Sequence, residues 1–248
     1  MFEGKVALVT GGASGIGRAA ALIYAQHGAS VIAADVNDDG GHETVRMIEE
    51  NGGKADFFHC NVADVQDCEA LVQHSVKTFG SLDIAFNNAG IAGQLMTFDK
   101  YPLDEWQRVI DINLSGVYYC MRFELQQMQT QESGGVIVNT ASILGQIGSG
   151  PAPAYVAAKH GVVGLTQSAA LQYARRNIRV NCVGPGYIET PMMEDQSERV
   201  KEMSLQMHPV GRKGQPEEVA ELVIWLSSDK ASFATGGFYP IDGGYLAM

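Results

Sequence analysis

A short apolar run at positions 5–10 leads into a glycine-rich turn, and this opening limits the possible folds more than any other part of the chain. Glycines stand at positions 11, 15 and 17, and an alanine-rich segment with helical spacing follows at 18–26. A strand, a glycine turn and a helix in this order bring backbone N–H groups and a helix N-terminus against a phosphate group. Only glycine lets the main chain come so close and still turn. The opening therefore predicts a nucleotide-binding turn formed by Gly11, Ser14, Gly15, Ile16 and Gly17.

A second apolar run, at positions 30–34, ends in Asp35. A carboxylate at this point of a β-α-β unit accepts hydrogen bonds from the adenosine ribose hydroxyls. The same carboxylate would repel the 2′-phosphate of NADP by about 4 kcal/mol per unit charge at 4 Å near a surface. Basic residues at positions 14 and 36 could offset this repulsion, but the sequence has Ser14 and Val36 there. We therefore expect NAD as the cofactor.

Apolar strand-like segments alternate with helix-like segments along the rest of the chain, for example a helix capped by Asp64 that ends near Gly80. This alternation is typical of a parallel sheet covered by helices on both faces. We expect one Rossmann-type α/β domain, residues 1–248, with a doubly wound parallel sheet of about seven strands. Residues 187–214 break the pattern, and such an irregular insert is predicted to be a substrate-binding lid. It carries Met192, Met193, Met203 and Met207.

Composition and charge exclude several classes of partner and location. A net charge of −11 argues against nucleic acid and anionic membranes, because both need clustered Lys and Arg. No apolar run approaches the length of a membrane span, and a strand that begins near residue 5 leaves no room for a signal peptide. The cysteines lack C-x-x-C spacing and the histidines lack metal-ligand spacing. We expect a cytoplasmic protein without a metal site and with reduced thiols at Cys60, Cys68, Cys120 and Cys182.

Two residues that could move a proton, Tyr155 and Lys159, lie four positions apart on a predicted helix at 152–175 and therefore share one face. Ser142 follows a predicted strand at 135–140. Ligands of an open parallel sheet bind beyond the carboxyl ends of its strands. The predicted strand ends bring together Thr10, Asp35, Asn88, Ser142 and Pro185.

These side chains suit hydride transfer between an alcohol carbon and a nicotinamide, because that reaction also moves a proton on or off the oxygen. A free tyrosine has a pKa near 10 and is a poor base at neutral pH. We expect the Lys159 ammonium to lower the pKa of Tyr155 by about three units, which takes about 4 kcal/mol. The Ser142 hydroxyl would polarise the substrate oxygen.

Several motifs follow one another along the chain: Thr-Gly-x-x-x-Gly-x-Gly at 10–17, Asn-Asn-Ala-Gly at 87–90, Asn113 on a long predicted helix at 103–128, Ser142, Tyr-x-x-x-Lys at 155–159, and Pro-Gly at 185–186. Together they resemble the motifs of the short-chain dehydrogenases/reductases, from about residue 6 to residues 241–244. The resemblance implies a Rossmann-type sheet and a catalytic tetrad of Asn113, Ser142, Tyr155 and Lys159. In such enzymes the asparagine holds a water that links the lysine to solvent.

The resemblance also implies cofactor contacts beyond the glycine turn and Asp35. They are Asn61, Val62, Asn88, Ala89, Gly90, Tyr155, Lys159, Pro185, Gly186, Ile188 and Thr190. The family often has aspartate at position 61, but asparagine can still accept a hydrogen bond from the adenine amino group. A homotetramer is implied, through the helices that bear Asn113 and Tyr155 and through the last strand. The expected walls of the substrate pocket are Gln94, Leu144, Gln146 and Tyr187.

We predict an NAD(H)-dependent oxidoreductase that interconverts a secondary alcohol and a ketone, with Tyr155 as general acid and base. The methionine-rich insert suits an apolar or cyclic substrate. One alternative is a 3-oxoacyl-carrier-protein reductase, whose acidic carrier needs a basic landing site. The polar segment 126–131 argues against it, whereas Arg175 and Arg176 favour it. The other alternative is a non-catalytic NAD-sensing regulator, which would typically have lost the tyrosine or the lysine.

Overall fold

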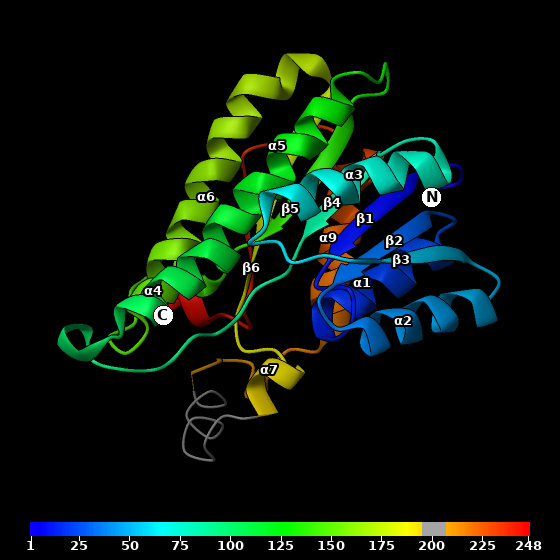
Figure 1. The fold of residues 1–248 in the computed structure, drawn as a ribbon. Helices are drawn as coiled ribbons and strands as arrows, with labels where there is room; N and C mark the ends of the chain where they lie inside the picture. Colours follow the sequence, from blue (N-terminus) through cyan, green and yellow to red (C-terminus); the bar gives the residue numbers. More distant parts are fainter. Residues whose placement is uncertain (195–206) are drawn as a thin grey trace.

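The computed structural model describes residues 1–194 and 207–248, and Figure 1 shows their fold. These residues form one parallel sheet of seven strands in the order β3-β2-β1-β4-β5-β6-β7. The order reverses between β1 and β4, which makes this the point where a doubly wound sheet opens a crevice. The predicted fold class is confirmed. The strands are β1 Val6–Thr10, β2 Ser30–Asp35, β3 Lys54–His59, β4 Ile84–Asn87, β5 Gly135–Thr140, β6 Ile178–Pro185 and β7 Phe238–Ile241.

Helices cover both faces of the sheet, and each face has its own apolar core (Figure 1). One core contains residues of α1 Gly15–Gln26, α2 Asp38–Glu50 and α9 Pro216–Ser227. The other contains residues of α3 Val65–Phe79, α5 Gly116–Met128 and α6 Pro153–Tyr173. In the described part of the chain, none of the helices combines the length and the apolar character that a membrane crossing requires.

The helix ends follow local sequence signals. The Asp64 side chain accepts a hydrogen bond from Gln66 at the start of α3, and Gly80 ends that helix in the left-handed conformation with φ +92°. Both features agree with the sequence prediction. Asn37 caps α2 in the same way by accepting from the Gly40 N–H at 3.0 Å. A capped start fixes where each helix begins relative to the strand before it.

The stretch predicted as one helix at 103–128 is divided into three parts. It consists of α4 Leu103–Ile110, a π-helical turn Asp111–Ser115, and α5. Asn113 lies buried in the π turn, where its side chain bonds the backbone of Ile91. Wide turns of this kind are often found at functional sites. Similarly, the helix predicted at 152–175 gives way after Tyr173 to a 3₁₀ turn Ala174–Arg176.

The irregular insert predicted at 187–214 is described only at its two ends. Its residues 195–206, including Met203, lie outside the described part of the chain. The outgoing end contains the short helix α7 Pro191–Glu194. The two ends are joined by a bridge between Ile188 and Gly214, with hydrogen bonds of 2.9 and 3.0 Å on either side of it. The base of the insert is therefore fixed against the end of β6.

Candidate active site

The glycine turn between β1 and α1 is too closely packed for side chains. A Cβ added at Gly17 would lie 2.0 Å from the Gly11 carbonyl oxygen, and one at Gly11, whose φ is +67°, would lie 3.0 Å from the Ala89 Cα. The Ser14 side chain makes no hydrogen bond to the α1 N-terminus, whereas α2 and α3 are capped by side chains. The first N–H groups of α1 are therefore left to an external acceptor, and the helix dipole favours an anionic one.

Asp35 is fixed beside this turn at the end of β2. Its Oδ2 accepts a hydrogen bond from the Ala13 N–H at 3.0 Å, and its Oδ1 accepts one from the Asn37 N–H at 3.0 Å. A carboxylate has about four lone-pair positions, so each oxygen retains one for a ribose hydroxyl. Ser14 and Val36, at the positions where a basic residue could offset a 2′-phosphate, are both exposed. The geometry thus suits a ribose without that phosphate.

The residues predicted near the adenine and the nicotinamide ribose also lie at strand ends. Asn61 follows β3, and its Oδ1 accepts the Ala63 N–H at 3.1 Å, which leaves its second lone pair for an adenine amino group. After β4, the N–H groups of Asn88 and Ala89 both donate to Thr10 Oγ1, at 3.0 and 3.1 Å. Thr140 Oγ1 donates to Asn88 Oδ1 at 3.3 Å. These hydrogen bonds connect the carboxyl ends of β1, β4 and β5, which together form the bottom of the crevice.

The remaining predicted contacts come from the end of β6 and the start of the insert. Gly186 donates its N–H to the Ile241 carbonyl at 3.1 Å, which fixes the Pro185–Gly186 turn on β7. Thr190 Cγ2 lies 3.1 Å from the position that a Cβ would take at Gly15. The start of the insert therefore contacts the glycine turn. Val62 and Ile188 are buried beside these segments.

The four predicted catalytic side chains come from three segments at the same edge of the sheet. Ser142, just after β5, lies near enough to Tyr155 of α6 for its hydroxyl to lower the pKa of the phenol, and its Oγ accepts the Leu144 N–H at 3.1 Å. The Lys159 Nζ lies 5.5 Å from the centre of the Tyr155 ring. Asn113 Oδ1 and Lys159 Nζ lie 3.0 and 3.8 Å from the position that a Cβ would take at Gly90. Because Gly90 has no side chain, the space between Asn113 and Lys159 stays open.

The titration behaviour of this group differs from the sequence prediction. Burial raises the pKa of Tyr155 above its usual value, and the nearby Ser142 hydroxyl only partly opposes this. Burial lowers the pKa of Lys159 to about 8. The expectation that Lys159 lowers the pKa of Tyr155 is wrong for this arrangement, because burial dominates and raises that pKa; the ammonium donates to the Thr140 carbonyl at 2.7 Å. The tyrosine is therefore poised as an acid.

A cluster of aromatic side chains adjoins Tyr155, and only one of its members was predicted. Tyr187, a predicted wall residue, lies near enough to Tyr155 to raise its pKa. His208 Nε2 accepts the Tyr187 N–H at 3.2 Å, and the Tyr245 ring lies 6.4 Å from that of Tyr187 and 5.7 Å from that of His208. A cavity of about 170 Å³ lies beside Tyr187 and His208. No sequence pattern pointed to His208 or Tyr245, because only the fold brings them to Tyr187.

Comparison with known proteins shows the family. A family model described as "Enoyl-(Acyl carrier protein) reductase" matches residues 11–246. The chain is 49% identical over 248 residues to a cyclohexanol dehydrogenase of Acinetobacter sp. (strain SE19), a match that covers 99% of this chain and 96% of the relative. The chain belongs to the short-chain dehydrogenase/reductase family. The resemblance predicted from the motifs is confirmed.

Other short-chain dehydrogenases/reductases are similar over nearly their whole length. A cis-4-hydroxycyclohexanecarboxylate dehydrogenase of Sinomonas cyclohexanicum is 42% identical, with 100% of this chain and 98% of the relative covered. A 3-oxoacyl-[acyl-carrier-protein] reductase of Thermotoga maritima is also 42% identical, with 99% of each covered. A crystal structure of levodione reductase superimposes with a TM-score of 0.96 at 37% identity, covering 100% of this chain and 99% of the other. A crystal structure of a NAD⁺-bound xylitol dehydrogenase superimposes with a TM-score of 0.93 at 34% identity, and the match covers 98% of this chain and 99% of the other.

Proposed function

We propose that the protein is an NAD(H)-dependent oxidoreductase that interconverts a neutral, cyclic secondary alcohol and its ketone. The observation that carries this proposal is the grouping of Ser142, Tyr155 and Lys159 at the same sheet edge as the glycine turn and Asp35. In this arrangement the proposed proton donor, Tyr155, lies beside the proposed dinucleotide site, which supports hydride transfer. The ring-bearing substrates of two similar enzymes, cyclohexanol and a hydroxycyclohexanecarboxylate, support the cyclic class.

The protein's own residues hold the reactants and move the proton. The α1 N-terminus binds the diphosphate, and Asp35 binds the adenosine ribose. Bound NAD supplies the hydride acceptor. Ser142 donates its hydroxyl hydrogen to the substrate oxygen, and Tyr155 takes the alcohol proton during oxidation or gives it to the ketone during reduction. Lys159 and Asn113 are proposed to pass that proton on to solvent through a bound water.

The preference for NAD over NADP rests on charge. The Asp35 carboxylate, fixed by two backbone N–H groups, would lie next to a 2′-phosphate. Repulsion at about 4 Å near a surface costs about 4 kcal/mol per unit charge. Val36 is 60% exposed and brings no positive charge to this place.

Two arginines near the proposed substrate pocket, Arg108 and Arg212, each form an ion pair with a glutamate, and this favours an uncharged substrate. Arg108 of α4 is paired with Glu105 at 2.8 Å, and that glutamate also accepts the N–H of the pocket residue Gln94. At the returning end of the insert, Arg212 is paired with Glu218 at 2.7 Å. Both guanidiniums already have a carboxylate partner, so among the described residues these two cations favour a neutral alcohol over a substrate carboxylate.

We also propose the organisation that the sequence suggests: one domain over residues 1–248, with 187–214 as its substrate-binding insert. Assembly as a homotetramer through α5, α6 and β7 is supported by exposed apolar side chains at each place. These are Tyr118 on α5, Leu171 on α6, and Phe233 in the segment before β7. The buried free thiols are compatible with the cytoplasm as the location.

A second candidate, a 3-oxoacyl-carrier-protein reductase, is suggested by the similar Thermotoga maritima enzyme. An acidic carrier would need cations near the catalytic crevice. Arg175 and Arg176 follow the end of α6, whereas Tyr155 lies in its first turn. At 1.5 Å per residue these arginines are about 30 Å along the helix from the tyrosine, at the opposite edge of the sheet. The alcohol dehydrogenase therefore fits the geometry better.

The proposal is tested by initial rates with cyclohexanol, 2-hexanol, cis-4-hydroxycyclohexanecarboxylate and a 3-hydroxyacyl-carrier protein, each with NAD and with NADP. We expect the highest kcat/KM with cyclohexanol and NAD. Turnover with NADP alone would contradict the role of Asp35. Preference for the carboxylate would contradict the neutral substrate class, and turnover of an acyl-carrier substrate alone would favour the second candidate.

A further inference from the structure

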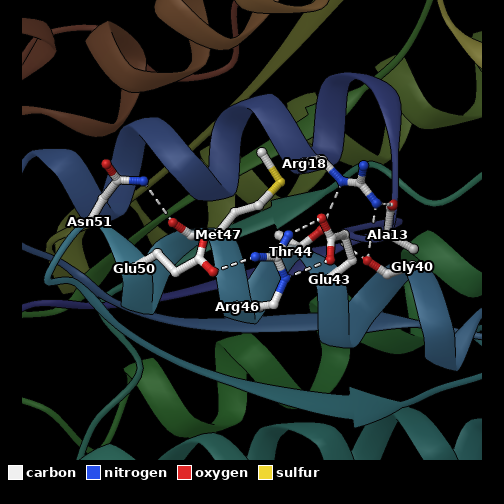
Figure 2. Close-up of polar contacts among 9 residues, drawn as sticks. All are labelled: Ala13, Arg18, Gly40, Glu43, Thr44, Arg46, Met47, Glu50 and Asn51. Atoms are coloured by element: carbon white, nitrogen blue, oxygen red, sulfur yellow. Dashed lines mark hydrogen bonds and ion pairs between the residues drawn. The ribbon is translucent and has the colours of Figure 1, made fainter.

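Arg18 of α1 reaches across to the start of α2, as Figure 2 shows. Its Nε donates a hydrogen bond to Thr44 Oγ1 at 2.9 Å. Its Nη2 donates both to the Ala13 carbonyl, in a short hydrogen bond, and to the Gly40 carbonyl at 3.1 Å. One guanidinium therefore connects the glycine turn, through Ala13, with the first turns of α2.

Thr44 makes a second connection between the same two segments. Its side chain is fully buried, and its hydroxyl can donate to the Gly12 carbonyl at 2.9 Å or to the Gly40 carbonyl at 3.1 Å. The same oxygen accepts the hydrogen bond from Arg18. Thr44 of α2 therefore holds the Gly12 carbonyl, and Arg18, which is hydrogen-bonded to Thr44, holds the Ala13 carbonyl.

The network includes the carboxylate that is proposed to bind the ribose. Ala13 is held on both sides, since its N–H donates to Asp35 Oδ2 and its carbonyl accepts from Arg18. Asp35 Oδ1 accepts the N–H of Asn37, and Asn37 in turn caps Gly40. A displacement of Arg18 would therefore be transmitted to both the glycine turn and Asp35.

The hydrogen bonds of Arg18 differ in kind from those of Arg46, which lies on the next helix. Arg46 pairs with the carboxylates of Glu43 and Glu50 on the exposed side of α2, as Figure 2 also shows. Within the described part of the chain, Arg18 donates to two carbonyls and a hydroxyl and to no carboxylate. Among the described residues it forms no ion pair, although its charge helps to lower the pKa of the nearby Glu43 carboxyl, and it lies beside the turn that is proposed to receive a diphosphate.

We propose that Arg18 and Thr44 are positioning residues for the cofactor, which hold the Gly12–Ala13 backbone and Asp35 in the geometry that receives its adenosine half. This inference rests on the proposed function, because it assumes that NAD binds at the glycine turn. Arg18 could not turn toward a 2′-phosphate without releasing the carbonyls of Ala13 and Gly40. The same contacts therefore support the selection of NAD.

The test compares Arg18→Met with Arg46→Met, which removes an arginine of the same length that does not touch the turn. Calorimetry measures Kd for NAD, for ADP-ribose and for nicotinamide mononucleotide. We expect Arg18→Met to raise Kd for NAD and ADP-ribose about 10- to 100-fold, because the lost hydrogen bonds come from a charged donor. Kd for nicotinamide mononucleotide, which lacks the adenosine half, and kcat at saturating NAD should change by less than about threefold. Arg46→Met should behave as wild type.

A second pair of variants tests the role without removing a charge. Thr44→Val keeps the shape but loses the hydroxyl, and Thr44→Ser keeps the hydroxyl. We expect weaker ADP-ribose binding in Thr44→Val and restored binding in Thr44→Ser, with thermal unfolding recorded for all variants. Equal affinities in the Arg18 and Arg46 variants, together with equal affinities in the two Thr44 variants, would overturn the positioning role alone. A wild-type protein that binds NADP but not NAD would overturn the proposed function and this inference with it.

Discussion

The Lys159 ammonium donates its hydrogen bond to the Thr140 carbonyl at 2.7 Å and lies 5.5 Å from the centre of the Tyr155 ring. The lysine is therefore fixed to the end of β5, and the phenol is governed mainly by its own burial. Two groups with pKa values displaced in opposite directions stand next to each other at the proposed site of proton transfer. Such displacements are a recurrent property of catalytic groups.

The first prediction concerns the pH dependence of the two directions of reaction. Burial raises the pKa of Tyr155, so the phenol is protonated at neutral pH and the fraction of phenolate grows as pH rises. The kcat/KM for alcohol oxidation should therefore increase with pH from about 6 to about 10, and that for ketone reduction should fall over the alkaline part. Initial rates in both directions measure this. An oxidation rate that does not change with pH would contradict it.

The second prediction concerns Ser142. Its hydroxyl lies near enough to Tyr155 to lower the pKa of the phenol, and it is proposed to polarise the substrate oxygen. Ser142→Ala should lower kcat about 100- to 1,000-fold, because one donor to a developing charge is lost, with little change in Kd for NAD. Ser149→Ala is the matched control in the same loop, since the hydrogen bond of Ser149 uses its backbone carbonyl. Equal activity of the two variants would remove Ser142 from the mechanism.

The third prediction concerns the choice of cofactor. Asp35→Ser combined with Val36→Arg removes the repulsion of a 2′-phosphate and adds a cation at an exposed position. The ratio of kcat/KM for NADP to that for NAD should rise about 1,000-fold, since about 4 kcal/mol of repulsion is relieved. Val36→Met is the control, because it changes the side chain without its charge. An unchanged ratio would show that other residues select the cofactor.

The fourth prediction concerns Glu124, a fully buried glutamate on α5. Asn87 donates to its Oε2 at 3.0 Å, and its Oε1 has no hydrogen-bond partner among the residues that the structure describes. Burial raises its pKa to about 8. Between the usual pKa near 4.5 and pH 8 the folded protein holds a proton that the unfolded chain releases, so the free energy of unfolding falls as pH rises.

Glu124→Gln removes this ionisation while it keeps the shape. Its free energy of unfolding should exceed that of wild type by an amount that grows from about pH 5 to about pH 8, to the order of a few kcal/mol. Urea unfolding at a series of pH values measures the difference. Glu69→Gln, at an exposed position on α3, should show no such growth. A constant difference for Glu124→Gln would mean that the carboxyl is already ionised in the folded protein.

The local part of the site was predictable from the sequence, but its long-range part was not. The glycine turn and Asp35 belong to one β-α-β unit, so their spacing along the chain determines their place in the fold. The π turn at Asn113 depends on hydrogen bonds to Ile91, 22 residues earlier in the chain. Helical periodicity therefore could not predict it.

The titration of Tyr155 shows a second limit of the sequence. The four-residue spacing correctly predicted that Tyr155 and Lys159 share a helix, but the sign of the pKa shift depends on burial and on which acceptor the ammonium takes. Both are properties of the packed structure. The same holds for His208 and Tyr245, which reach Tyr187 only through the fold.

The central claim, that Tyr155 moves the proton in a hydride transfer to NAD, is tested most directly by Tyr155→Phe. The variant keeps the ring and loses only the hydroxyl beside Ser142. Rapid mixing with cyclohexanol would follow NADH formation in a single turnover, and calorimetry would give Kd for NAD. We predict at least about a 1,000-fold slower hydride transfer with Kd for NAD within about threefold of wild type. Hydride transfer at the wild-type rate in Tyr155→Phe would contradict the account.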